Sequence, residues 1–284
     1  MANAEIIAVG SEMLTSQRVD TNSLYLADHL NALGVEVRRK LVVGDDRSVL
    51  VEAIGQALAA VEILILTGGL GPTEDDVTRD AVAAATGRPQ HFVPEIATAI
   101  EARFRLRGRV MPEINKRQAY VLDGAEILPN KNGTAPGQWL EQNGRIIALL
   151  PGPPSELKPM FDAECFPRLA KRLPAQVIRS RHYRITGLTE SDLDQLIAPV
   201  YSKYTNPVTT VLAHAGDMQV YLRARSATAD EAEKLLAEAG DPVEALLGDR
   251  IYSRSGESLE EVVGRLLTEK GALWPSPKAA QAAW

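Results

Sequence analysis

The chain has little of several residue types on which common kinds of site depend. It contains one cysteine, Cys165, which excludes an internal disulfide and suits a reducing cytoplasm. Its four histidines are scattered without the spacing of metal ligands, so we assign them no role. The net charge is −6 and no basic patch with aromatic residues is present. Both features argue against direct binding of nucleic acid, and the charge also argues against an anionic membrane surface.

Long hydrophobic runs are also missing. No apolar stretch approaches the ~20 residues that are needed to span a bilayer. The chain opens directly on an expected strand, without a basic and apolar leader, so we expect a cytoplasmic protein. The remaining composition is that of an ordinary globular protein, with 45% hydrophobic and 24% charged residues among 284. This length is sufficient for two domains.

Strands and helices alternate in the first half of the sequence. This alternation predicts a parallel sheet with helices on both faces. Ligands of such sheets bind beyond the carboxyl ends of the strands, where Gly10, Gly44 and Gly68 each follow a predicted strand. We expect strands at 4–10, 35–44, 61–66 and 146–150, and helices at 21–34, 45–58 and 79–87.

The rest of the chain is organised differently. Residues 92–118 favour a helix that Pro112 breaks, and a domain boundary is expected near Pro174. The following segment predicts a small α+β domain, in which Gly240 and Asp241-Pro242 are expected to interrupt a helix over 229–247. The expected domains are 1–170 and 175–253, with a linker helix at 254–271.

The most informative stretch is Thr67 to Thr78, between a buried strand and a helix. Its glycines Gly68, Gly69 and Gly71 allow backbone N–H groups to approach phosphate oxygens, although they are also ordinary turn residues. Its acids, Asp75 and Asp76, are candidates for binding a divalent cation or activating water, as is Asp80 in the helix. The alternative is that they merely favour a helix N-terminus. We expect only one of Asp75 and Asp76 to face the ligand, because they point in different directions at a helix start.

Three further loops carry candidate residues. Glu12 follows Gly10, and Asp45 is either a metal ligand or the cap of the next helix. Asn22 either bonds a ligand or caps its helix. The small residues Asn132, Gly133 and Thr134 form either a loop that closes over a ribose or phosphate, or an ordinary turn. Gly152 lies in a rigid loop of prolines, which is expected to shape the site rather than to donate hydrogen bonds.

Six motifs together identify a resemblance. They have the order and spacing of the CinA proteins, and the chain resembles this family up to about Gly271. The resemblance implies a three-layer molybdopterin-binding domain of the MoaB/MogA type, with a mostly parallel sheet, followed by a small α+β middle domain. The motifs are Gly10-Ser11-Glu12-Met13-Leu14, Asp20-Thr21-Asn22, Val43-Gly44-Asp45-Asp46, Thr67 to Thr78, Asn132 to Gly137 and Leu150-Pro151-Gly152-Pro153-Pro154.

The resemblance also implies an activity. CinA proteins are expected to hydrolyse ADP-ribose to AMP and ribose 5-phosphate with a divalent metal such as Mg²⁺, and K⁺ is an additional candidate ion. Related domains self-associate, so we expect a homodimer with a small nucleotide substrate. The alternatives are a molybdopterin-binding or adenylyl-transferring protein of the MoaB/MogA type, and a non-enzymatic regulatory protein linked to competence.

The candidate residues divide into three groups. The expected catalytic residues are Asp76, Asp75, Asp80 and Glu12; the expected metal ligands are Asp76, Asp45 and Glu12; and the expected substrate contacts are Gly68, Gly69, Gly71, Thr73, Asn22, Asn132, Gly133, Thr134 and Gly152.

The last residues do not follow the family pattern. The reading frame can be shifted so that, from Leu273 on, each new codon begins on the third base of a present codon. In this shifted frame, codons that are compatible with the sequence can encode Leu-Ala-Val-Ala-Glu-Ser-Cys-Thr-Gly-Gly-Leu. This string is similar to the opening of the nicotinamide mononucleotide deamidase domain of full-length CinA proteins. We therefore expect that one base was lost near Ala272, that residues 272–284 are out of frame, and that the deamidase domain is missing. Resequencing the gene tests this hypothesis.

Overall fold

The computed structural model describes residues 2–16, 18–174, 176–214 and 216–271. The segment 272–284, which we expect to be out of frame, lies outside these residues. The chain divides into two compact units, Met1–Ala175 (unit 1) and Gln176–Trp284 (unit 2). Each unit is described by itself below.

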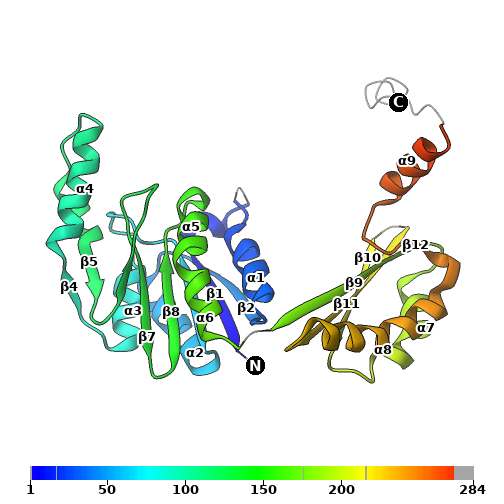
Figure 1. Ribbon diagram of the computed structural model, residues 1–284. Coiled ribbons are helices and arrows are strands. Elements are labelled where there is room, and N and C mark those ends of the chain that lie inside the picture. Colours follow the sequence, from blue (N-terminus) through cyan, green and yellow to red (C-terminus); the bar gives the residue numbers. More distant parts are fainter. Residues whose placement is uncertain (1, 17, 175, 215, 272–284) are drawn as a thin grey trace. The chain divides into compact units, whose positions relative to one another are not determined.

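Unit 1 is built on a six-stranded sheet with the strand order β2-β1-β3-β8-β7-β6 (Figure 1). The first four strands are parallel, β7 runs antiparallel to β8, and β6 runs antiparallel to β7. The expectation of a mostly parallel sheet is therefore confirmed. The strands are β1 Asn3–Val9, β2 Glu36–Val43, β3 Ile63–Thr67, β6 Glu126–Leu128, β7 Gly137–Gln142 and β8 Arg145–Leu150; β4 Gln90–Phe92 and β5 Tyr120–Leu122 pair separately.

Helices cover both faces of this sheet and give three layers. Successive residues of a strand point to opposite faces, so Ile65 of β3 packs with α1, α5 and α6, whereas its neighbour Leu66 packs with α2 and α3. A short π-helical segment, Phe161–Cys165, joins α5 to α6. The helices of unit 1 are α1 Asn22–Ala32, α2 Arg47–Ala60, α3 Thr78–Thr86, α4 Pro94–Leu106, α5 Pro154–Met160 and α6 Phe166–Arg172.

The register of the parallel strands places four loops at one edge. Val9 pairs with Val43, and Thr67 pairs with Leu150, so β1, β2, β3 and β8 end at the same level. The chain leaves all four strands at this edge. The segments after Val9, Val43, Thr67 and Leu150 are therefore brought together although they are far apart in the sequence.

Two expectations for unit 1 were wrong in detail. Residues 92–118 do not form one broken helix, because only α4 is α-helical, and Glu113–Ala119 is a 3₁₀ helix. Helix α3 begins at Thr78, so Asp75 and Asp76 lie in the loop before it and not at its start. The loop therefore determines where these two carboxylates point.

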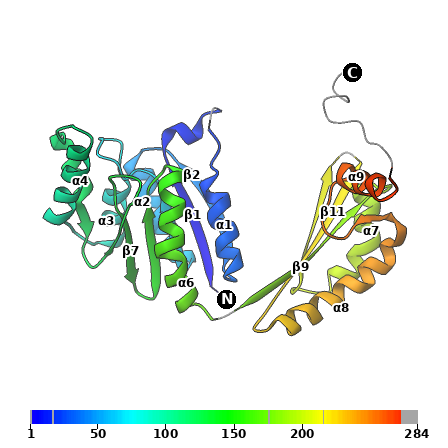
Figure 2. The same cartoon turned by 45° about the horizontal axis from the view of Figure 1, so that its top comes forward.

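Unit 2 is a four-stranded antiparallel sheet of the order β10-β11-β9-β12. Helices α7 and α8 pack against one face of it, around buried residues such as Tyr183 and Val220 (Figures 1 and 2). This is the expected α+β arrangement. The elements are β9 Val177–Ile185, α7 Glu190–Tyr201, β10 Val208–His214, β11 Asp217–Ser226, α8 Ala229–Leu247, β12 Ile251–Ser253 and α9 Leu259–Glu269.

Helix α8 is continuous, so the expected interruption at Gly240 and Asp241-Pro242 was wrong. Pro242 has no N–H for the carbonyl group of Glu238, and the hydroxyl of Tyr204 donates to that carbonyl instead, at 3.1 Å. A Cβ on Gly240 would lie 3.1 Å from a guanidinium nitrogen of Arg181. The glycine thus permits close packing of the helix on β9.

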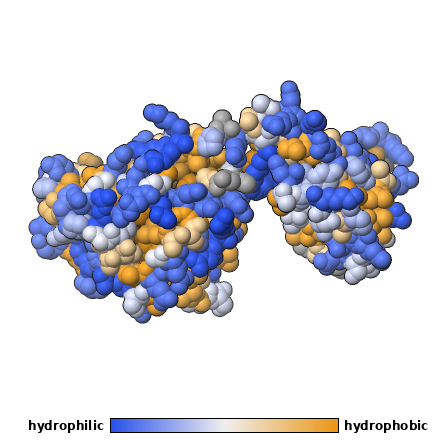
Figure 3. All heavy atoms as spheres, turned by 90° about the horizontal axis from the view of Figure 1, so that it is seen from below, coloured by the Kyte–Doolittle hydropathy of each residue, from blue (hydrophilic) through white to orange (hydrophobic). Residues whose placement is uncertain are grey.

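The surface mixes polar and apolar residues on the face shown in Figure 3. Such mixing is usual for folded domains. No helix in the described part of the chain has the length and the apolar character that are required to cross a bilayer.

Cys165 provides a test of this packing, because it is fully buried between the sheet and α6. Burial raises the pKa of the thiol to about 12, so the reactive thiolate is scarce at neutral pH. We predict that an aromatic disulfide reagent labels the native protein only as fast as unit 1 unfolds, and labels it at once in denaturant. Rapid labelling in native buffer, measured by absorbance, would contradict this packing.

Candidate active site

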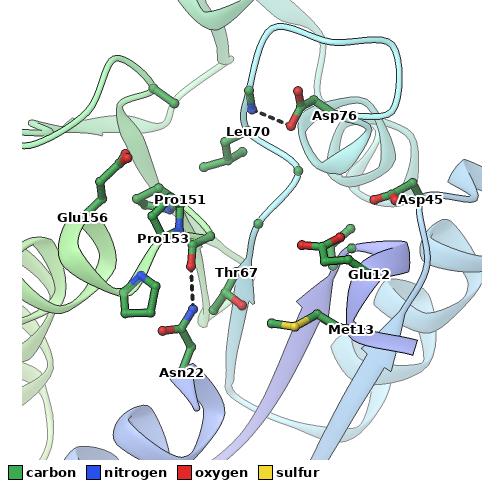
Figure 4. A pocket seen from close by; sticks show the side chains of 18 of the residues that line it. Glu12, Met13, Asn22, Asp45, Thr67, Leu70, Asp76, Pro151, Pro153 and Glu156 are labelled. Atoms are coloured by element: carbon green, nitrogen blue, oxygen red, sulfur yellow. Dashed lines mark hydrogen bonds between the residues drawn. The ribbon is translucent and has the colours of Figure 1, made fainter. Parts of the chain in front are cut away.

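The loops at the carboxyl edge of the unit 1 sheet enclose a cavity of about 570 Å³. This volume lies within the range of pockets for small molecules and cofactors. In Figure 4, Glu12 and Asp45 lie on one side, Pro151, Pro153 and Glu156 lie on the other, and the segment from Thr67 to Leu70 runs between them.

The glycine loop after β3 has no room for side chains. Gly68 and Gly69 have φ values of +91° and +63°, which L-residues rarely adopt. A Cβ on Gly68 would overlap the carbonyl oxygen of Val9, one on Gly69 would overlap the hydroxyl of Thr78, and one on Gly71 would overlap the carboxylate of Asp76. Each glycine is therefore needed for the path of the backbone.

Asp76 holds the shape of this loop. Its carboxylate accepts hydrogen bonds from the N–H groups of Gly71 (2.6 Å, Figure 4) and Thr73 (2.8 Å), and it shares the Thr73 hydroxyl (2.6 Å) with Asp75. Both oxygens are thus used within the loop. Gly69 and Leu70 also line the cavity, and their N–H groups have no hydrogen-bond acceptor among the described residues. These two donors are available to an anionic ligand.

The carboxylate of Glu12 has no bonding partner among the residues that the structure describes. It lies in a 3₁₀ turn, Ser11–Leu14, directly after β1. Its carboxylate lies over Gly10, where a Cβ would be 2.6 Å from Oε2. The side chain is exposed and makes no hydrogen bond or ion pair with the residues that the structure describes. Glu12 is therefore free to bind a cation or a water molecule.

Asp45 lies beside this turn. Its Oδ2 accepts from the N–H of Ser11 at 2.8 Å, and its own N–H donates to the Ser11 hydroxyl at 3.0 Å. Helix α2 is capped by Asp46, which accepts from the N–H groups of Ser48 and Val49. Asp45 is consequently not a cap, and it ties the loop after β2 to the turn that carries Glu12.

Asn22 does not cap α1 either, because Asp20 accepts from the N–H of Ser23. The Asn22 side chain is 2% exposed, and its Nδ2 donates to the carbonyl oxygen of Gly152 at 2.7 Å (Figure 4). It thereby joins the start of α1 to the loop after β8 in the wall of the cavity. Thus Asn22 links two of the loops that form the site.

The structure brings most of the candidates together but not all. Asp80 lies in a separate cleft of about 260 Å³, where it accepts from Gln90 Nε2 at 2.6 Å. The Asn132 side chain donates to the carbonyl oxygen of Ser155, and the carbonyl oxygen of Gly133 accepts from Arg103. Thr73 donates hydrogen bonds to Asp76. Asn132, Gly133 and Thr73 do not line the cavity. The candidates that do are Glu12, Asn22, Asp45, Gly68, Gly69, Gly71, Asp75, Asp76, Thr134 and Gly152.

Sequence reasoning missed Glu156 and Arg18, which also line the cavity. Glu156 lies in the first turn of α5, and its Oε2 accepts from Asn130 Nδ2 at 2.7 Å, opposite Glu12. It follows β8, so the rule that ligand-binding loops follow parallel strands was sufficient to find it. Arg18 had no comparable signal, because it lies in an irregular segment between the first strand and helix.

The cavity is strongly acidic. Five carboxylates, those of Glu12, Asp45, Asp75, Asp76 and Glu156, line it together with one arginine, Arg18. A hydrogen bond from the Thr73 hydroxyl lowers the pKa of Asp75 below its ordinary value, so this acid is ionised at neutral pH. An anionic ligand in such a cavity requires a cation to offset the repulsion. Within the described residues, no group of three or more histidine, cysteine or acidic side chains is arranged to hold a metal by itself.

Comparison with known proteins identifies the class. Residues 5–171, the α/β part of the chain with this cavity, match the family described as "Probable molybdopterin binding domain". Residues 180–253, which form most of unit 2, match the "Damage-inducible protein CinA KH domain". The chain belongs to the CinA family.

Individual relatives agree with this assignment. A CinA-like protein of Solibacter usitatus is 61% identical over 265 residues, which are 93% of this chain and 64% of that protein. A CinA-like protein of Koribacter versatilis is 47% identical over 93% of this chain and 65% of its own length. The chain thus spans less than two thirds of these curated relatives. The crystal structure of CinA from Thermoplasma acidophilum, described as having unknown function, is 30% identical with a TM-score of 0.53, and covers 57% of this chain and 95% of that one.

The glycine loop gives a direct test of the site. We predict that Gly69→Ala displaces the loop, because the new Cβ overlaps Thr78 and the φ of +63° is unfavourable. Binding of inorganic pyrophosphate, measured by calorimetry, should fall about tenfold or more.

Gly55→Ala is the matched control. Gly55 lies in the middle of α2, and a Cβ there meets nothing within 4 Å. This variant should bind as the wild type does and gain up to about 1 kcal/mol of stability from helix propensity. Equal binding by the Gly69 and Gly55 variants would remove the glycine loop from the site.

Proposed function

We propose that this chain hydrolyses the pyrophosphate bond of ADP-ribose and releases AMP and ribose 5-phosphate with the help of a divalent cation. The observation that carries this proposal is the position of the unclaimed N–H groups of Gly69 and Leu70 in one cavity with the unpaired carboxylate of Glu12. The two N–H groups suit phosphate oxygens, and the carboxylate suits a cation or an attacking water.

The reaction needs little covalent chemistry from the protein. The oxygen of a water molecule bonds to one phosphorus, the bridging P–O bond breaks, and its electron pair stays on the leaving phosphate. The protons of the water pass to a carboxylate or to solvent. The protein's contribution is then to hold the pyrophosphate on Gly69 and Leu70 and to place acceptors such as Glu12 near the water.

The free carboxylate oxygens of the cavity suit a cation that is bound partly by the protein and partly by the phosphate groups of the substrate. Glu12 has both oxygens free and Asp45 has one, whereas loop donors occupy both oxygens of Asp76. Mg²⁺ commonly binds to one or two carboxylates, phosphate oxygens and water. Glu12 and Asp45 would hold it here, and Asp76 is better explained as the residue that shapes the loop. When bound, the ion would neutralise charge on the phosphates.

Molybdopterin binding is the second candidate, because residues 5–171 match the model of a molybdopterin binding domain. A pterin phosphate would use the same N–H groups of Gly69 and Leu70. The cavity of about 570 Å³ has room for either ligand. The two functions differ in their outcome, since only the hydrolase releases AMP.

The deciding experiment is to incubate the purified chain with ADP-ribose and Mg²⁺ and to follow the products by chromatography. We expect AMP and ribose 5-phosphate in equal amounts, no reaction with a chelator present, and recovery when Mg²⁺ is restored. Tight binding of molybdopterin without release of AMP would favour the second candidate.

Replacing Glu12 tests the role of its carboxylate. We predict that Glu12→Gln lowers the rate of AMP release about 100-fold or more and leaves the melting temperature unchanged, since the side chain has no partner to lose. Glu36→Gln is the control, because Glu36 is exposed at the opposite end of the sheet. Full activity in the Glu12 variant would exclude this acid from the reaction.

A further inference from the structure

A buried arginine lies directly behind the glycine loop. Arg79, in the first turn of α3, is 4% exposed and has no acidic side chain within ion-pair distance among the described residues. Burying a cation without a carboxylate partner is costly. Burial lowers the pKa of Arg79 to about 10, with Asp76 and Asp80 opposing this effect from further away, and the group remains charged at neutral pH.

The partners of this guanidinium are carbonyl groups of the loop. Its Nη1 donates to the carbonyl oxygen of Leu70 at 2.7 Å, and its Nη2 donates to that of Gly71 at 2.9 Å. The adjacent residue, Thr78, bonds the two preceding carbonyls: its hydroxyl donates to Gly68 at 2.8 Å and its N–H donates to Gly69 at 3.2 Å. The start of α3 therefore occupies four consecutive carbonyl groups of the loop.

This pairing leaves the backbone of residues 68–71 with one kind of free polar group. The N–H of Gly68 donates to Leu150, and the N–H of Gly71 donates to Asp76. Within residues 68–71, the N–H groups without an acceptor among the described residues are those of Gly69 and Leu70. The backbone of residues 68–71, whose carbonyls are occupied from behind, offers donors to a ligand, and such a backbone surface suits anions.

We propose that Arg79 is a positioning residue for the phosphate groups of the ligand: it holds the Leu70 and Gly71 carbonyls behind the loop and places a fixed positive charge beneath the free N–H groups. The inference rests on the proposed function for the identity of the site. It goes further in assigning anion selectivity to a residue that does not line the cavity. In a pocket lined by five carboxylates, this charge adds to that of Arg18 in offsetting the repulsion of the phosphates.

The test uses Arg79→Met, which removes both the charge and the donors, and Arg79→Lys, which keeps the charge but not the two-pronged geometry. Arg88→Met is the matched control. Arg88 also donates to a backbone carbonyl, that of Asp123, and to Gln142, and it does not line the cavity. All three variants are compared with the wild type as the full chain, and folding is checked by melting temperature.

Three measurements separate positioning from general stability. Calorimetric binding of inorganic pyrophosphate should weaken about tenfold or more in the Met variant, weaken less in the Lys variant, and be unchanged in the control. The dependence of affinity on salt concentration should become shallower in the Met variant and stay as in the wild type for Lys, because only the former loses a charge. With ADP-ribose as the substrate, the KM of the Met variant should rise while its kcat changes by less than about threefold.

Binding of pyrophosphate by a folded Arg79→Met variant with wild-type affinity and salt dependence would overturn the proposal. If this variant does not fold, equal affinity of the Lys variant and the wild type would overturn it instead. The absence of pyrophosphate binding by the wild type would also do so. Failure of the wild type to release AMP, with pyrophosphate still bound through Arg79, would refute the hydrolase and leave the anion site standing.

Discussion

The site depends on how the loop after β3 is tied to the start of α3. Thr78 and Arg79 take the carbonyl groups of residues 68–71, and Asp76 takes two N–H groups and a hydroxyl of the loop. With these bonds made, the backbone of Gly69 and Leu70 offers only donors. The glycines are a consequence of the same arrangement, because the loop lies too close to Val9, Thr78 and Asp76 for a Cβ. The phosphate binding that we propose would thus rest on backbone groups and would not need a lysine in the cavity.

Charge explains the division of roles around the cavity. Five acids and one arginine line it, so a pyrophosphate is tolerated only with added positive charge. The buried Arg79 supplies part of it from behind the loop. A divalent cation on Glu12 and Asp45 would supply the rest on the open side. Glu156, fixed by Asn130 on the opposite wall, is a hydrogen-bond acceptor and suits the hydroxyl groups of a sugar better than a phosphate.

The sequence was sufficient to predict the strand-helix alternation, the mostly parallel sheet and the edge at which the loops meet, because apolar runs and glycines at strand ends report these directly. It was not sufficient to assign roles to individual acids. Asp75 and Asp76 are neighbours, yet hydrogen bonds from residues 71 and 73 decide their orientation. Asp45 was a candidate cap, but Asp46 caps α2 and the carboxylate of Asp45 bonds the N–H of Ser11 instead. Arg79 carried no signal, since a charged residue at a helix start is usually solvated, and its burial depends on the fold around it.

The most direct measurement is a crystal structure of the chain with Mg²⁺ and an ADP-ribose analogue whose bridging oxygen is replaced by a methylene group. We expect phosphate oxygens within hydrogen-bond distance of the Gly69 and Leu70 N–H groups, and the cation between the phosphates and Glu12. An analogue bound with its phosphates away from these N–H groups, or bound outside the cavity, would contradict this expectation.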